Sequence, residues 1–138
     1  MDPQLVVSMD AEAGASRSNR TRFIDHRGQR ILLFDYQGIH DPQEALREIE
    51  NSKAVVATQP RKSLRILTNV RNARYNGAVL QGMKELARHD EPYVTASAVV
   101  GLTGLLRIAY TAVTTFSRRN IAVFDSEAEA LDWLASQD

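Results

Sequence analysis

Short apolar runs and amphipathic segments alternate along this chain from residue 21 onward. Residues 21–38 contain two apolar runs separated by the turn sequence HRGQ, which predicts two antiparallel strands joined by a hairpin. Three later apolar runs predict strands at residues 63–70, 92–101 and 120–125. The amphipathic segments predict four helices, at residues 41–60, 76–89, 103–119 and 126–137.

The predicted order of elements is ββαβαβαβα. Strands that alternate with helices of this length indicate right-handed crossovers and therefore a mostly parallel sheet. The first strand, joined to the second by a hairpin, is expected as an antiparallel edge. We therefore predict one α/β domain at residues 21–138 with a five-stranded sheet, preceded by a polar, aperiodic and flexible tail at residues 1–20.

Helix-capping residues support the predicted helix starts. A side chain that can accept a hydrogen bond stands at the start of each helix, namely Asp41, Asn76, Thr103 and Ser126. Glu44 and Glu129 follow the first and last of these by three residues, as in a capping box. Pro42 occupies a first helical position, where its missing N–H is harmless.

Polar residues gather where the predicted parallel strands end. The carboxyl ends of such strands form the edge at which open α/β sheets bind ligands. The candidate residues there are Asn69, Arg71, Asn72, Arg74, Tyr75 and Thr103. Two arginines beside helix N-termini suit a phosphate, a carboxylate or an acidic partner. The alternative is that both are solvated and paired with Asp35 or Asp125.

The third predicted helix has more apolar residues than packing on one side of a sheet requires. One face carries Leu105, Ile108, Ala109, Ala112, Val113 and Phe116, and a second group adds Leu102, Leu106 and Tyr110. The surplus residues have three interpretations, which are contact with a neighbouring helix, a dimer surface, and the wall of an apolar pocket.

Composition and charge exclude several function classes. The chain has 138 residues, no cysteine, and 17 basic against 17 acidic residues. Zero net charge gives no general attraction to nucleic acid, and the three histidines stand apart, so we expect neither nucleic-acid binding nor a metal or other cofactor. No Ser-His-Asp arrangement is visible, and GLTG at residues 101–104 lacks the lysine of a P-loop. Without a signal peptide or an apolar span of about 18 residues, we expect a cytoplasmic protein with no integral membrane segment.

Three phrases of the sequence resemble the SpoIIAA-like proteins, which share the STAS fold and are related to the CRAL-TRIO lipid-transfer domain. They are GQRILLFDYQG, PRKSLRILTNVRNARYN and the long segment KELARHDEPYVTASAVVGLTGLLRIAYTAVTTFSRRNIAVFDSEAEALDWL. The resemblance extends from about Thr21 to Ser136, and it implies a single SpoIIAA/STAS-like domain without a catalytic motif. The strand order is inferred from this resemblance.

The resemblance implies a regulatory role, with one departure. The best-known proteins of this fold are partners of an anti-sigma kinase and carry a phosphorylated Ser or Thr in the turn after the third strand. Here that turn, residues 70–75, contains two arginines and no Ser or Thr. We therefore expect the usual phospho-switch to be missing, because the turn is better suited to receive an anion than to become one.

These observations favour a non-enzymatic regulatory or protein-interaction module whose protein partner is unknown and which forms a homodimer through the third helix. The first alternative is a CRAL-TRIO-like binder of a small apolar ligand, with a pocket at residues 102–116. The second is an enzyme with an anion site, which would require a general acid or base beside Arg71 and Arg74. The sequence shows no clear candidate, and Asp35 or Asp125 buried against these arginines would favour this alternative.

Overall fold

The computed structural model describes residues 19–116 and 120–138, although the side chains of residues 113–116 lie outside the description. The strands are β2 (Thr21–His26), β3 (Gln29–Asp35), β4 (Leu64–Asn69), β5 (Val94–Val100) and β6 (Ile121–Phe124). The helices are α2 (Pro42–Val56), α3 (Gly77–Asp90), α4 (Gly104–Phe116) and α5 (Glu127–Ser136), with a 3-10 turn at Glu91–Tyr93. The predicted order ββαβαβαβα is confirmed.

The five strands form one mixed sheet whose order, β2-β3-β4-β5-β6, follows the chain. β2 pairs antiparallel with β3, and the other neighbours are parallel, as predicted. The hairpin closes through Arg27 (φ 50°) and Gly28 (φ 79°). Two successive positive φ angles are typical of a type I′ turn, which matches the twist of the strands that it joins.

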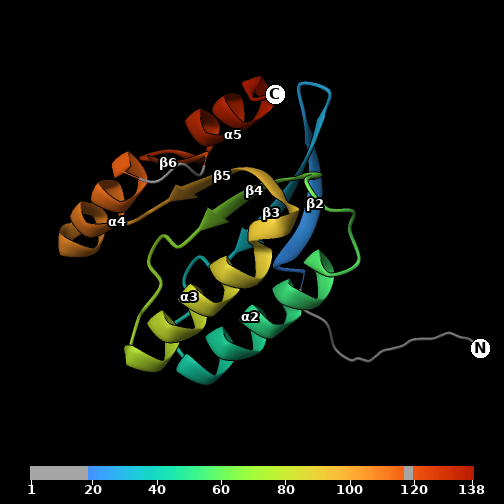
Figure 1. Ribbon diagram of the computed structural model, residues 1–138. Helices are drawn as coiled ribbons and strands as arrows, with labels where there is room; N and C mark the ends of the chain where they lie inside the picture. Colours follow the sequence, from blue (N-terminus) through green and yellow to red (C-terminus); the bar gives the residue numbers. More distant parts are fainter. Residues whose placement is uncertain (1–18, 117–119) are drawn as a thin grey trace, which may run out of the picture.

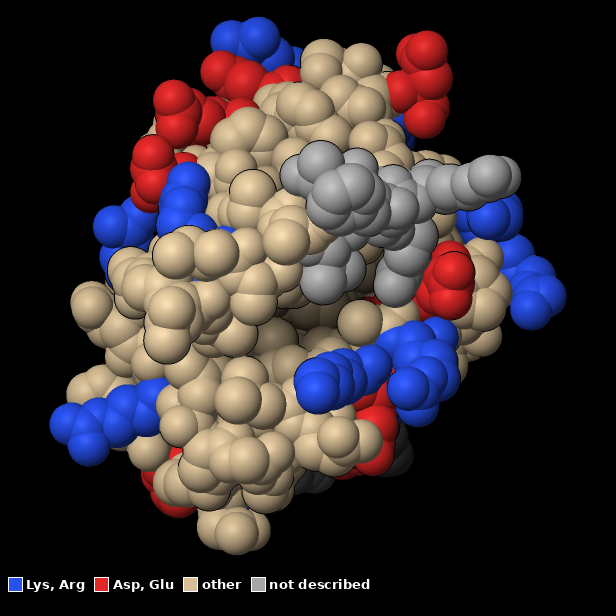
Figure 2. Space-filling view, turned by 60° about the vertical axis from the view of Figure 1, so that its left-hand side comes forward, with Lys and Arg blue, Asp and Glu red and all other residues tan. Residues whose placement is uncertain are grey.

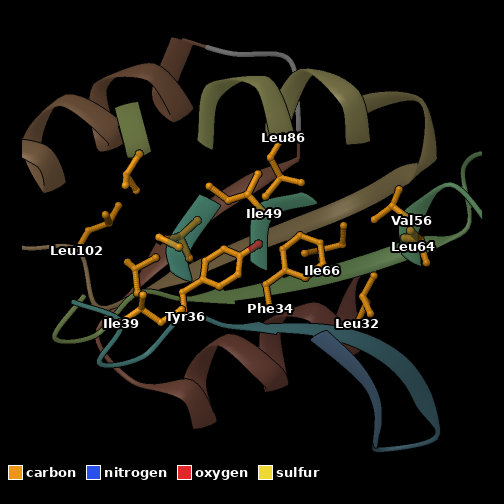
Figure 3. Close-up of a cluster of buried hydrophobic side chains, with 14 residues drawn as sticks. Leu32, Phe34, Tyr36, Ile39, Ile49, Val56, Leu64, Ile66, Leu86 and Leu102 are labelled. Atoms are coloured by element: carbon orange, nitrogen blue, oxygen red, sulfur yellow. The ribbon is translucent and has the colours of Figure 1, made fainter. Parts of the chain in front are cut away.

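The helices cover both faces of the sheet, with α2 and α3 on one face and α5 on the other (Figure 1). Alternate residues of β3 explain this arrangement, because successive side chains of a strand point to opposite faces. Leu32 and Phe34 belong to the cluster that also contains Ile49 of α2 (Figure 3), whereas Ile31 and Leu33 pack in the cluster with Leu134 of α5. A strand buried on both faces therefore reads as one continuous apolar run.

Helix α4 divides its apolar residues between the core and the surface. Leu102, just before the helix, is buried, and Leu106 and Tyr110 pack against the cluster under α2 and α3. Leu105 and Ile108 are instead 85% and 67% exposed. The same outer face contains the exposed Ala109 and Ala112, while the side chains of Val113 and Phe116 lie outside the description.

The predicted helix caps are present at three helices. The side chain of Asp41 accepts from Gln43 N (3.0 Å), that of Asn76 from Val79 N (2.8 Å), and that of Ser126 from Glu129 N (3.1 Å). At the fourth predicted cap, the backbone oxygen of Thr103 accepts from Arg107 N. The three side-chain bonds satisfy amide groups that the first turn of a helix leaves without a partner, whereas the bond at Thr103 is the first backbone bond of α4.

Arg20, which the sequence assigned to the tail, contacts the domain directly. Its Nη1 donates to the backbone oxygens of Asp35 (3.2 Å) and Gln37 (2.9 Å), and its Nε lies 3.7 Å from Glu44 Oε2. The ordered contacts of the domain therefore begin before Thr21. The remainder of the predicted tail, residues 1–18, lies outside the described residues.

A chain of hydroxyl groups lies between α2 and the sheet. Tyr36 OH is 2.6 Å from Ser52 Oγ, Ser52 Oγ is 2.8 Å from Thr21 Oγ1, and Thr21 Oγ1 donates to Glu48 Oε2 (2.7 Å). Because the proton of Thr21 goes to the carboxylate, Ser52 donates to Thr21 and Tyr36 donates to Ser52. Burial raises the pKa of Tyr36 above its usual range, so Tyr36 keeps its proton at neutral pH.

Candidate functional site

The predicted meeting of the strand ends is confirmed around residues 70–76, which we call the rim turn. This turn leaves β4 and lies between the segments that follow β3 and β5. Three backbone hydrogen bonds hold it, each 2.9 Å long: Gly38 N to Arg71 O, Arg74 N to Ile39 O, and Val70 N to Val100 O. A fourth of the same length, from Tyr36 N to Asn69 O, joins the strand ends just before the turn. The rim turn therefore has a fixed backbone although it carries no regular secondary structure.

The side chain of Asn69 anchors the rim turn to the end of the sheet. Its side chain is buried, with the residue 3% exposed. Asn69 Oδ1 accepts from Arg71 N (3.0 Å), and Nδ2 donates to Gln37 Oε1 (3.1 Å) and Glu127 Oε2 (2.9 Å). Because its amide is fully engaged, Asn69 positions the turn and presents little surface to a partner, in contrast to the surface contact expected from the sequence.

Gly101 allows the rim turn to approach the end of β5. Its φ is +98°, and a Cβ atom added there would lie 2.5 Å from the backbone nitrogen of Arg71 and 2.7 Å from its Cα. Both the conformation and the space therefore require glycine. This close approach fixes the position of the Arg71 backbone and therefore the point from which the Arg71 side chain extends.

Arg71 and Arg74 are exposed on the rim turn, and neither is neutralised by the predicted carboxylates. Arg71 Nη2 donates to the backbone oxygen of Asp125 (2.9 Å). The carboxylate of Asp125 is paired with Arg107 Nη1 (2.9 Å), and that of Asp35 lies 4.0 Å from Arg22 Nη1. Within residues 19–116 and 120–138, no carboxylate lies within ion-pair distance of either rim guanidinium.

The other predicted site residues surround these arginines. Asn72 is exposed with φ +57°, and its backbone oxygen lies 3.0 Å from Nε2 of His40. Tyr75 is half-buried, its hydroxyl lies 3.4 Å from the oxygen of Val70, and burial raises its pKa to about 12. Thr103 is exposed on the neighbouring segment after β5. The rim is therefore polar, positively charged and without an ionised tyrosine at neutral pH.

A small cavity lies behind the rim turn. Its volume is about 20 Å³, and its lining is almost entirely apolar, including Ile39, Val70, Ala73, Val79 and Met83. Arg74 and Tyr75 also contribute to the lining, and no residue of α4 does. A pocket for a drug-sized ligand has a volume of about 300 Å³ or more. The cavity therefore differs in place and size from the ligand pocket expected at residues 102–116.

The face that carries α4 and the N-terminal ends of α2 and α3 is largely uncharged at its centre (Figure 2). A hollow opens there, with basic side chains beside it, and acidic side chains stand mainly toward the periphery (Figure 2). This distribution matches a local positive site on a chain whose total charge is zero. Long-range attraction to any polyanion is weak under these conditions.

The two carboxyl groups considered for an anion-binding enzyme are both accessible to solvent. The side chain of Asp125 is 84% exposed and that of Asp35 is 31% exposed, so neither is buried against Arg71 and Arg74. Among the residues that the structure describes, no group of three or more potential ligands could hold a metal ion. The same part of the chain contains no helix long and apolar enough to cross a membrane.

Comparison with known proteins places the fold. No family model matches the sequence, and no curated protein does. A solved structure from Shewanella loihica PV-4, described as an uncharacterised protein of the DUF3478 family with a SpoIIAA-like fold, superposes with a TM-score of 0.65 at 14% identity. The match covers 88% of this chain and 99% of the other. The fold is therefore SpoIIAA-like, as the sequence resemblance implied.

Proposed function

We propose that this chain is a non-enzymatic regulatory or protein-interaction module of the STAS type, which binds an acidic protein partner through the rim turn. One observation supports this most strongly: Arg71 and Arg74 present two guanidinium groups on a fixed backbone, with no carboxylate partner among the residues that the structure describes. A fixed turn loses little conformational entropy on binding. Arginine also binds carboxylates through paired hydrogen bonds.

The rim turn has no hydroxyl side chain that a serine/threonine kinase could phosphorylate. The negative charge at this contact would therefore come from the partner. Residues 70–76 contain neither Ser nor Thr, and the hydroxyl of Tyr75 is half-buried. A phosphate on the turn would also be expected to pair with the neighbouring arginines and cancel their charge. We therefore propose that regulation, where it occurs, acts on the acidic partner.

Exchange of both rim arginines for glutamate is expected to weaken partner binding by about tenfold or more, because attraction becomes repulsion. The test is affinity capture of proteins from cells that express the chain, quantified by mass spectrometry, with Arg71→Glu/Arg74→Glu beside the wild type. Proteins that depend on the rim should disappear from the variant, and added salt should weaken their capture by the wild type.

Arg61→Glu provides the matched control for this experiment. Arg61 is exposed in the connection before β4, at the opposite end of the parallel strands from the rim turn. The control changes charge by the same amount per residue and should retain the captured proteins. Retention of the same proteins by the double rim variant would show that the rim is not the binding site.

We propose, as a second function of the same module, that two copies associate through the outer face of α4. The support is the exposure of Leu105 (85%) and Ile108 (67%) one turn apart on one helix. Arg107 is the only charged residue of α4, and it pairs with Asp125. A face without free charge meets its own copy in a two-fold dimer without like-charge repulsion.

In analytical ultracentrifugation the wild type is expected to sediment as a dimer, and the double variant Leu105→Asp/Ile108→Asp as a monomer. Both side chains are largely exposed, so the change should leave the fold intact. Ala54→Asp, an equally polar change at an exposed position of α2, should remain dimeric. A wild-type protein that stays monomeric at high concentration would remove this second proposal.

A further inference from the structure

The cavity behind the rim turn is small and almost entirely apolar. Its volume of about 20 Å³ has room for one water molecule, but its lining offers almost no polar surface. The cavity is partly open to the surface, and its lining offers a water molecule few of the two to four polar partners that it needs. The apolar lining atoms therefore lack dispersion contacts, which a small apolar group that enters from outside would supply.

The position of the cavity connects it to the charged site. Ala73 and Val70 of the rim turn belong to its lining, and so does Arg74, whose side chain is exposed. An apolar depression and a guanidinium that no described carboxylate neutralises are therefore contributed by the same short turn. A ligand that fills the depression brings its neighbouring groups within reach of the charge.

We propose that this cavity receives an aliphatic side chain of the protein partner, within two residues of an Asp or Glu that pairs with Arg74. The inference rests on the proposed function and specifies the chemistry of its partner. Residues two apart in an extended segment point to the same side, which allows one side chain to enter the cavity while the other reaches the guanidinium. The flexible side chain of Met83 adapts the lining to the inserted group.

Cavity size favours a peptide side chain over a free fatty acid as the occupant. Both would offer a carboxylate to Arg74. An acyl chain needs a pocket of about several hundred Å³, whereas a side chain that remains attached to its own protein needs only to insert its terminal methyl groups. A cavity of about 20 Å³ fits only the terminal methyl groups of a side chain.

The test is selection of a random peptide library displayed on phage against the immobilised full chain. The enriched peptides are expected to combine an aliphatic residue with an acidic residue within two positions. The best peptide is then synthesised and its dissociation constant measured by fluorescence polarisation. Ala73→Met, which fills the cavity, should weaken this peptide by about tenfold or more through loss of aliphatic burial.

Two further variants separate cavity filling from loss of folding. Ala54→Met makes the same exchange at an exposed position of α2 and should bind the peptide as the wild type does. Val79→Ala enlarges the cavity, since Val79 is buried and belongs to its lining. Selection on Val79→Ala should shift the enriched aliphatic residue to a larger one, a change that a damaged protein would not produce.

The outcomes distinguish this inference from the proposed function. Acidic peptides that bind wild type and Ala73→Met equally, but not Arg71→Glu/Arg74→Glu, would overturn the cavity proposal and leave the rim proposal standing. Peptides that bind all three proteins equally would overturn both. A selection that enriches no peptide above an uncoated surface, or competition by decanoate that displaces the selected peptide at equal concentration, would also overturn the cavity proposal.

Discussion

The variant Gly101→Ala is expected to lose about 3 kcal/mol of unfolding free energy, because two costs act together. The backbone φ of +98° is strained for any residue with a Cβ atom. The new Cβ would also meet backbone atoms of Arg71 at 2.5 and 2.7 Å, and a backbone cannot turn away as a flexible side chain can. Urea unfolding followed by circular dichroism measures the loss.

Gly38→Ala separates these two costs. Gly38 also has a positive φ, of +73°, but a Cβ atom there would meet no atom within 4 Å. Its loss of unfolding free energy should therefore be about 1–2 kcal/mol and reflect the strained backbone conformation alone. Equal losses at the two positions would mean that the contact with Arg71 contributes nothing. Partner capture should suffer more in Gly101→Ala, since only there does the new Cβ atom meet the backbone of the rim turn.

Ser52→Val is expected to lower the free energy of unfolding by about 4 kcal/mol, because it removes the centre of the hydroxyl chain. Ser52 is completely buried and bonds both Tyr36 OH and Thr21 Oγ1. Valine makes neither bond and adds volume to a site that is already filled. Tyr36 then retains a buried hydroxyl without its acceptor, and chemical unfolding measures the sum of these effects.

Ser136→Val is the matched control for the buried serine. It makes the same exchange near the end of α5, where Ser136 is exposed, donates to the carbonyl of Trp133 and accepts from the exposed side chain of its neighbour Gln137. Its loss of unfolding free energy should be about 0.5 kcal/mol or less, as is usual at exposed helix positions. A loss at Ser52 no larger than that at Ser136 would contradict the structural importance of the hydroxyl chain.

The sequence was sufficient to predict where the rim lies, since that prediction depends only on the order and direction of the strands. Apolar runs located the strands, and alternating helices required them to be parallel, so their carboxyl ends had to meet at one edge. Arg71 and Arg74 follow the end of β4 directly and could therefore be assigned to that edge. The order of the strands was not available from periodicity and came from the family resemblance.

The contacts within the rim could not be read from the sequence. Arg107 is the partner of Asp125, yet the two residues belong to different elements and no spacing rule connects them. The spacing of Ser52 from Ile49 and Val56 predicts that it lies on the inner face of its helix, which indicates burial but not the hydroxyls that it contacts. Asn69 likewise gave no sign that its amide would be fully engaged below the turn.

Helix α4 shows a related limit of periodicity. Leu102, Leu106 and Tyr110 face the core, while Leu105 and Ile108 face outward. When apolar residues surround most of a helix, the period of 3.6 residues no longer identifies one inner side. The choice is made by the sheet and the neighbouring helices, and these are known only after the chain has folded.

The order of the strands in the sheet has a consequence for synthesis on the ribosome. Each strand pairs with the one made just before it, so the sheet can grow by addition at one edge as the chain emerges. Helix α5, which covers the second face of the sheet, is synthesised after all five strands because it is formed by residues 127–136. Until then, Ile31, Leu33 and Leu67 remain uncovered on the nascent sheet, and a chaperone that holds this surface would release it when α5 docks.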